Sequence, residues 1–343
     1  GHRSQHQGRQ RRQDQRQRGI SLAISDNRID NDVLAYIDNS TIDVAEAVSI
    51  SAETLETNLV NSGAVAASIA ASISLASAGL SGGGAGATNE VTNSVKAYID
   101  GDSTIVIAGG GVAISASDNA TIESDVGVVA IGGGVVGASI GISWTDNSVD
   151  NDVHAYIDSK VNVTTGGIDI MADSTAYSEA VGFATSVAIG AGAFAGAGTD
   201  LNSTIAGSVK AYVGPAGDLT IASSGTGGGE LNILATTDQQ TLVDAAGTAI
   251  AAGAGVTVGV SLADAAIQGS TQAYLAGSLT GGDALNIIAD NTSDADATSF
   301  ALAGGSLGLV GSGAGTTALA ALPVGVPAWA AYRSRISPTS TWC

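Results

Sequence analysis

The stretch NDVLAYIDNSTI at residues 31–42 returns as NSVKAYIDGDSTI at 93–105 and NDVHAYIDSKVNV at 151–163, and this recurrence decides the fold. Shorter copies follow as VKAYVG at 209–214 and TQAYLA at 271–276. One tyrosine marks each copy: Tyr36, Tyr98, Tyr156, Tyr212 and Tyr274. Successive tyrosines are 62, 58, 56 and 62 residues apart. Such a period is typical of a supersecondary unit that stacks on its neighbours.

The repeated phrase alternates as a β-strand does. Val33, Ala35 and Ile37 share one face of the expected strand, and Tyr36 lies on the other. The residue before the Ala-Tyr pair varies in a way that only solvent tolerates: Leu34, Lys96, His154, Lys210 and Gln272. We therefore expect the tyrosines to face outward with these residues. If the copies stack in register, the tyrosines form a row along one outer face.

Two further elements accompany each copy. A second alternating phrase recurs as VSISA at 48–52, VAISA at 112–116, IDIMA at 168–172, LNILA at 231–235 and LNIIA at 285–289. Between the phrases lie stretches of Gly, Ala, Ser and Val, such as 63–78 and 126–144, which favour strands packed at short distance over helices. Asp and Asn clusters at 26–27, 30–32 and 146–152 predict turns.

These patterns predict an all-β fold, a β-solenoid similar to a parallel β-helix, built from about five repeats of roughly 60 residues over residues 19–322. We expect Val, Ala and Ile inside and acidic and hydroxyl side chains outside. Residues 1–18 hold no aliphatic or aromatic side chain, which predicts a disordered basic tail. Residues 323–343 predict an irregular tail with three of the four prolines. A wrong reading frame or cloning junction is the alternative explanation of both ends.

The charge distribution excludes some partners. Residues 19–332 carry four basic and 31 acidic groups, which gives 4 − 31 = −27. Such a surface repels nucleic acid and anionic lipid. The single cysteine, Cys343, allows no internal disulfide. The uncharged stretch 299–332 is diluted by Gly and Ser and has no aromatic girdles, so we expect no membrane insertion.

The copies at 31–42, 93–105 and 151–163 resemble the filamentous repeat regions of giant bacterial surface and secreted proteins, of the leukotoxin and filamentous haemagglutinin kind. The resemblance covers roughly residues 19–320. It implies an extracellular or cell-surface location, a β-helical rod, and attachment to cell-surface or matrix polymers, with self-association as a further option. In the last two copies Gly214 and Ala276 replace the aspartate of the motif, which weakens the case for a functional role of this aspartate.

Calcium is the one candidate cofactor. Asp26, Asp30 and Asp32 recur at equivalent places as Asp146, Asp150 and Asp152, and hard cations prefer clustered oxygen ligands. The nonapeptide of calcium-binding rolls is missing, because GGGAGATNE at 82–90 lacks its aspartate. Asx turns that face solvent are the alternative explanation of these residues.

Catalysis has few residues to draw on. The repeat region has one histidine, His154, which any Ser/His/Asp triad would need, and no cysteine. The Gly132–Gly137 match to a dinucleotide loop continues as a strand, where a helix start would be required. We therefore expect a structural or adhesive stalk with no enzymatic activity. The alternatives are a carbohydrate-active enzyme on a β-helix, using paired carboxylates, or a fragment of a leukotoxin-like toxin.

Overall fold

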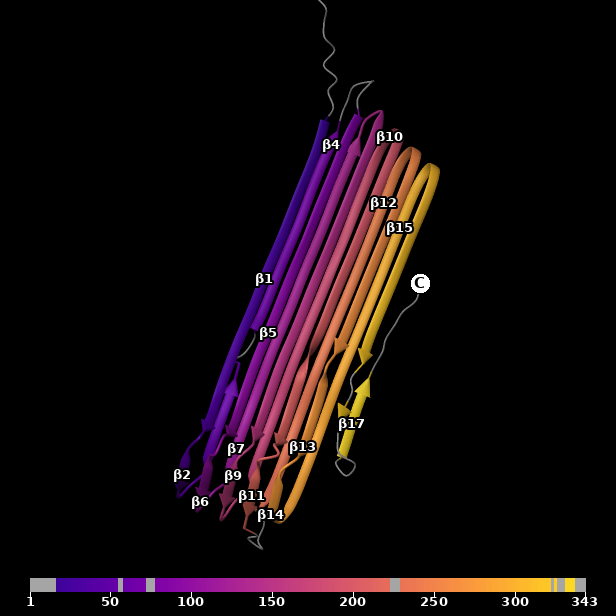
Figure 1. Ribbon diagram of the computed structural model, residues 1–343. Coiled ribbons are helices and arrows are strands. Elements are labelled where there is room, and N and C mark those ends of the chain that lie inside the picture. The colour runs from indigo at the N-terminus through magenta and orange to yellow at the C-terminus, as the bar shows by residue number, and fades with distance from the viewer. Residues whose placement is uncertain are drawn as a thin grey trace, which may run out of the picture.

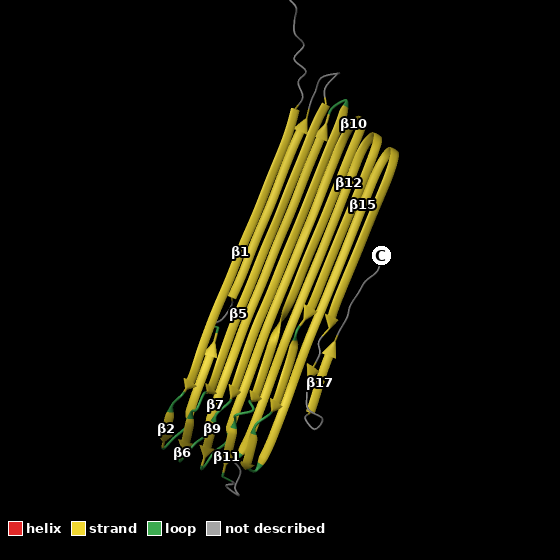
Figure 2. Cartoon of the chain, viewed as in Figure 1, coloured by secondary structure: helices red, strands yellow, loops and turns green. Residues whose placement is uncertain are grey.

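The chain forms a flattened β-solenoid. The computed structural model describes residues 17–54, 58–71, 78–222, 229–321, 324–325 and 331–336. All regular elements within these ranges are β-strands, and Figure 2 shows them as two closely apposed layers of long, nearly parallel strands. The expected all-β, parallel β-helix-like architecture is therefore confirmed.

One coil of the solenoid consists of two long strands and one short strand. The chain runs along the first long face in β5 (Ala78–Asp100), crosses in the short β6 (Thr104–Ile107), and returns along the second long face in β7 (Val112–Gly133). A tight turn at Gly134 and Val135 then leads into β8 (Val136–Ile157), which begins the next coil. Figure 1 shows the short strands gathered at one end of the plate and the tight turns at the other.

The other strands repeat this path. They are β1 (Gln17–Asp38), β2 (Thr41–Val44), β3 (Val48–Glu53), β4 (Asn58–Ala71), β9 (Lys160–Val163), β10 (Ile168–Val213), β11 (Asp218–Ile221), β12 (Glu230–Gln268), β13 (Ser270–Leu275), β14 (Ser278–Gly281), β15 (Ala284–Ala321), β16 (Val324–Gly325) and β17 (Ala331–Ile336). β10, β12 and β15 each run through a tight turn, so one strand serves both faces.

The described residues make six coils on the first face. Coil 1 begins with β1, coil 2 with β5, coil 3 with β8, and coils 4, 5 and 6 with the second halves of β10, β12 and β15. All pairings between coils are parallel, and equivalent repeat positions face each other, as Tyr36 faces Tyr98. Each repeat of about 60 residues is therefore one wide coil.

The interior is a wedge. At the wide end the short strands form a third side, and the core there consists mainly of Val, Ile and Leu, including Ile105, Val161 and Leu219. At the narrow end the core consists mostly of alanine. There the two faces approach so closely that serines bond across the interior, with 2.9 Å between Ser68 Oγ and Ser81 Oγ. The expected close packing of the glycine-rich stretches is thus present.

The Asp and Asn clusters do not form turns, which corrects the sequence interpretation. They lie within β1, β5 and β8, and their asparagines point inward. Asn27 Nδ2 donates to Asn89 Oδ1 at 2.9 Å, and Asn89 Nδ2 donates to Asn147 Oδ1 at 2.8 Å. Because the coils are in register, these amides bond to their own equivalents one coil away, which satisfies buried polar groups without a turn. Asn151 is an exception, because it is buried and neither amide atom has a hydrogen-bond partner.

Hydroxyl side chains also lie inside, where we expected them outside. Thr241 Oγ1 donates to Ser203 Oγ at 2.7 Å, and Ser203 Oγ donates to Ser178 Oγ at 2.6 Å. All three residues are buried. Small hydroxyl side chains suit the narrow interior, because each can bond to a hydroxyl on the same or the opposite face.

The two ends lie mostly outside the described residues. β1 already begins at Gln17, so the last two residues of the expected basic tail belong to the sheet. In the stretch expected to be irregular, β16 pairs with β13 and β17 pairs with β15. The last complete coil offers unpaired backbone groups along its edge, and these short strands pair with them.

Candidate functional site

The five tyrosines form a continuous row on the outer side of the first face. Neighbouring ring centroids are 5.2, 4.9, 4.8 and 4.9 Å apart, and neighbouring ring planes differ by 9°, 2°, 6° and 11°. The spacing equals the distance between hydrogen-bonded strands, so one ring stacks in each of coils 1 to 5. Such stacking turns the ring faces toward each other and leaves edges and hydroxyl groups toward solvent.

Two columns of polar residues lie beside the tyrosine row. Leu34, Lys96, His154, Lys210 and Gln272 precede the tyrosines and face outward with them. Asp38, Asp100 and Asp158 follow the first three tyrosines. The hydroxyl of Tyr156 donates to Asp100 Oδ2 at 3.3 Å. We call the tyrosines with these two columns the tyrosine surface.

Burial raises the pKa values of four tyrosine hydroxyls in the row, those of Tyr98, Tyr156, Tyr212 and Tyr274. Burial, followed by the neighbouring Tyr274 and by Asp158, raises the pKa of Tyr212 to about 12. Burial and nearby carboxylates also raise the pKa values of Tyr98, Tyr156 and Tyr274. A negative charge on one of these four rings would lie next to neighbouring rings and carboxylates, so the four stay neutral over the ordinary pH range.

His154 belongs to a serine-histidine-aspartate group that lacks the order of a catalytic triad. His154 Nε2 lies 3.0 Å from Ser208 Oγ, and Ser208 Oγ donates to Asp152 Oδ1 at 2.7 Å. Since the serine proton points to the aspartate, the histidine cannot accept it and activate the serine. Burial, and then Lys210, lowers the pKa of His154 to about 4, although Asp152 opposes the shift.

The structure separates the six aspartates proposed for calcium into two distant groups. Asp26, Asp30 and Asp32 lie on coil 1, and Asp146, Asp150 and Asp152 lie on coil 3. Coil 2 places Thr88, Thr92 and Ser94 between them, so equivalent carboxylates are about 9.6 Å apart at two strand spacings.

Several of these carboxylates already have protein partners. Asn202 Nδ2 donates to Asp146 Oδ1 at 3.1 Å, and Arg28 lies 3.8 Å from Asp30. Across the described ranges, no group of three His, Cys, Asp or Glu side chains is placed to hold a metal ion. The geometry therefore does not assemble the calcium site that the spacing suggested.

The nearest arrangement to paired carboxylates is on the second face. Glu123 on β7 and Glu179 on β10 are direct neighbours across the ladder and face outward. Asn61 Nδ2 donates to Glu123 at 3.2 Å, and the Tyr177 hydroxyl donates to Glu179 at 2.8 Å. Both carboxylates lie on a sheet surface next to hydrogen-bond donors, an arrangement that also suits simple stabilisation of neighbouring coils.

Asp118 is a buried acid that the sequence analysis missed. It points into the interior, where Thr54 Oγ1 donates to its Oδ1 at 2.8 Å and Asn93 Nδ2 donates at 2.9 Å. Burial raises its pKa, although these hydrogen bonds oppose the shift. The period-two pattern that begins at 112–116 could have predicted this burial. If the pattern continues to residue 118, Asp118 shares the inward face with Ile114 and Ala116.

The chain has no match among protein-family models, curated proteins or solved structures. No helix among the described residues is long and apolar enough to cross a membrane.

Proposed function

We propose that the chain is a structural and adhesive stalk segment of a long extracellular repeat protein. The observation that carries this proposal is the tyrosine surface, which presents the same group once per coil at about 5 Å. A regular array of weak sites suits a polymer, because many small contacts with one long partner add up to firm attachment.

The electrostatics of the surface select the kind of polymer. The region from 19 to 332 has a formal charge of −27, so anionic polymers are repelled. The stacked rings hide their faces from solvent, which leaves ring edges, hydroxyl groups, the three aspartates, and the amines of Lys96 and Lys210 as the contacts. We therefore assign a cationic or hydroxyl-rich polysaccharide as the partner, bound along the solenoid axis.

The test is the binding of the full chain to immobilised polysaccharides of different charge, measured by biolayer interferometry. We expect binding to the cationic chitosan that weakens with added salt, and no binding to anionic heparin. Short chitosan oligomers should bind at least tenfold more weakly than the polymer. Binding to heparin, or equal affinity for a monosaccharide and the polymer, would overturn the proposal.

Paired variants locate the site. Asp38→Asn with Asp100→Asn removes two carboxylates of the tyrosine surface and should weaken chitosan binding several-fold. Asp125→Asn with Asp244→Asn removes two outward carboxylates from the second face and should leave binding unchanged. Equal losses in both variants would mean that net charge alone attracts the polymer.

A further inference from the structure

Two outward columns of the first face, near the narrow edge, alternate between a branched aliphatic side chain and glycine from coil to coil. The first column, in coil order, is Ile20, Gly82, Ile140, Gly196, Val258 and Gly311. The second is Leu22, Gly84, Ile142, Gly198, Val260 and Gly313. Coils 1, 3 and 5 thus form apolar ridges, and coils 2, 4 and 6 form grooves.

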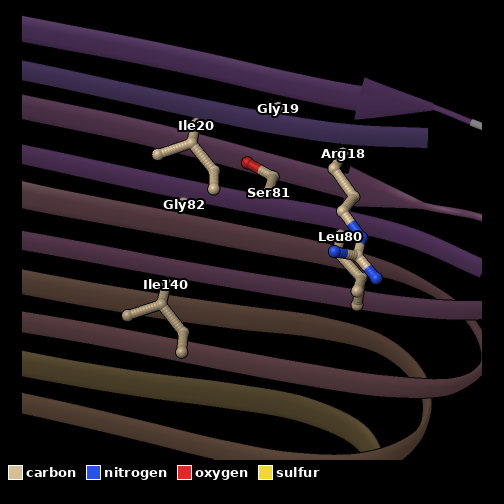
Figure 3. A pocket seen from close by; sticks show the side chains of 7 residues that line it. All are labelled: Arg18, Gly19, Ile20, Leu80, Ser81, Gly82 and Ile140. Atoms are coloured by element: carbon tan, nitrogen blue, oxygen red, sulfur yellow. The ribbon is translucent and has the colours of Figure 1, made fainter. Parts of the chain in front are cut away.

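The ridges are exposed and most of the grooves are empty. The six ridge side chains are between 40% and 85% exposed. Figure 3 shows Ile20 and Ile140 on either side of Gly82, in a pocket that Leu80 and Arg18 close at one end. A methyl group at Gly82, Gly198, Gly311 or Gly313 would have no atom within 4 Å.

Elsewhere the molecule fills comparable grooves with its own side chains. The ring of Trp144 covers Gly86 on the first face, and the ring of Phe183 covers Gly127 on the second face. Gly82 and Gly198 have no such cover, although they lie in the same sheet. Of the five described glycines with open space around an added methyl group, four lie in the two alternating columns, and the fifth, Gly304, lies on the second face.

We infer that this ridged surface docks a second copy of the same chain, ridge into groove. Ridges recur every two coils, about 9.6 Å, which leaves one strand spacing between them for a ridge of the partner. With six coils, a two-fold axis along the strands reverses coil order and sets coils 1, 3 and 5 over coils 6, 4 and 2 of the partner.

The available area suits a specific dimer. Together with the flanking outward columns that begin at Arg18 and Ile24, the patch spans four columns and six coils, roughly 700 Å² per copy and about 1,400 Å² for the pair from strand dimensions. That total lies within the range of stable protein interfaces. A lipid bilayer is the other apolar partner, but fluid acyl chains do not need a two-coil alternation of shape.

Charge sets the conditions for this pairing. The two alternating columns carry no charged side chain, and the four-column patch holds only Arg18 on coil 1 and Asp200 on coil 4, so the ridged surface has little charge to oppose the approach of a second copy. Because the two-fold axis runs along the strands, the wide, acidic half of each copy lies opposite the wide, acidic half of the other. Aligned sheets pack at about 30° to each other, which splays these halves apart. Residual repulsion between them should weaken with salt.

The test measures the oligomeric state of the full chain by analytical ultracentrifugation at 0.15 M and 1 M NaCl. We expect a dimer whose dissociation constant falls at the higher salt concentration. Gly82→Ile with Gly198→Ile fills the grooves in open space and should weaken the dimer at least tenfold, although it adds apolar surface. Ile140→Ser with Val258→Ser removes ridges and should have the same effect.

The matched control is Ile69→Ser with Ile250→Ser, which removes two exposed side chains from the second face and should leave the dimer intact. Circular dichroism verifies the fold of each variant.

A groove-filled variant that associates as strongly as the wild type would overturn the inference, because apolar surface alone would then explain association. A wild-type monomer at both salt concentrations would overturn it too, and co-sedimentation with phosphatidylcholine vesicles would then identify the bilayer as the partner. Chitosan binding is measured separately, so either proposal can fail alone.

Discussion

Tyr156 occupies the middle of the tyrosine row, with ring centroids of its neighbours at 4.9 and 4.8 Å. Tyr156→Ala removes two stacked pairs and a half-buried ring, so we expect the free energy of unfolding to fall by about 2–3 kcal/mol. Tyr36 stacks on one neighbour and is 57% exposed, and Tyr36→Ala should cost about 1 kcal/mol. Urea denaturation of both variants measures the difference. Equal costs would show that the stacking adds nothing.

His154 gives the fold a pH dependence of predictable sign. Its pKa of about 4 in the folded chain lies below the ordinary value of 6.5. Between these values the unfolded chain binds a proton that the folded chain does not, so stability falls as the pH falls from 6.5 to 4. After screening by solvent, the loss should be roughly 1–2 kcal/mol.

The control for this prediction is His154→Gln, because the equivalent position in coil 5 is Gln272. Carboxylates titrate in both proteins, so the difference between their stability curves isolates the histidine. We expect that difference to change by the stated amount across the window. Parallel curves would contradict a neutral, half-buried His154.

At the scale of the strand, the tight turns at the narrow edge depend on particular glycines. Gly253 has φ of +134°, and a Cβ atom there would overlap the carbonyl oxygen of Gly190 in the coil before it. Gly253→Ala should therefore destabilise the fold by several kcal/mol, through strain and displaced backbone. Thermal unfolding measures the effect.

Gly304→Ala is the matched control, because it lies in β15 on the second face, away from the ridged surface, with open space around its Cβ position. It should be neutral or raise stability by up to about 1 kcal/mol, since alanine restricts the unfolded chain. If both substitutions had the same effect, the turn geometry would be wrong.

The repeated Ala-Tyr phrases allowed the strands, their parallel stacking and the outward tyrosines to be predicted, because period-two alternation and in-register copies leave few options. The asparagines misled the interpretation. The stretch from Asn89 to Asn93 has the composition of a turn. Each of these two asparagines nevertheless bonds to its equivalent one coil away. The pattern of one strand alone does not reveal a partner on the next coil. The alternation of Gly82 with Ile140 likewise becomes visible only when coils are aligned.

At the scale of the whole molecule, the plate has two dissimilar halves. The wide half contains the Val and Ile core, the tyrosine surface and outward carboxylates, whereas the narrow half has an alanine core and uncharged, ridged outer columns. The two proposals use different halves: polymer attachment the wide one and pairing the narrow one. Both the tyrosine surface and the ridged surface lie on the outer side of the first face, so in the proposed pair the two tyrosine surfaces face each other, and a polymer reaches them where the wide halves splay apart.

The most direct test of this account is an experimental structure of the chain, by crystallography or cryo-electron microscopy, in which the distances between rings of successive tyrosines are measured. One wide coil per repeat predicts ring centroids 4.8–5.2 Å apart from Tyr36 through Tyr274, all on one outer face. Spacings near 14 Å, which correspond to three narrow coils per repeat, or tyrosines scattered among separate cores, would contradict it.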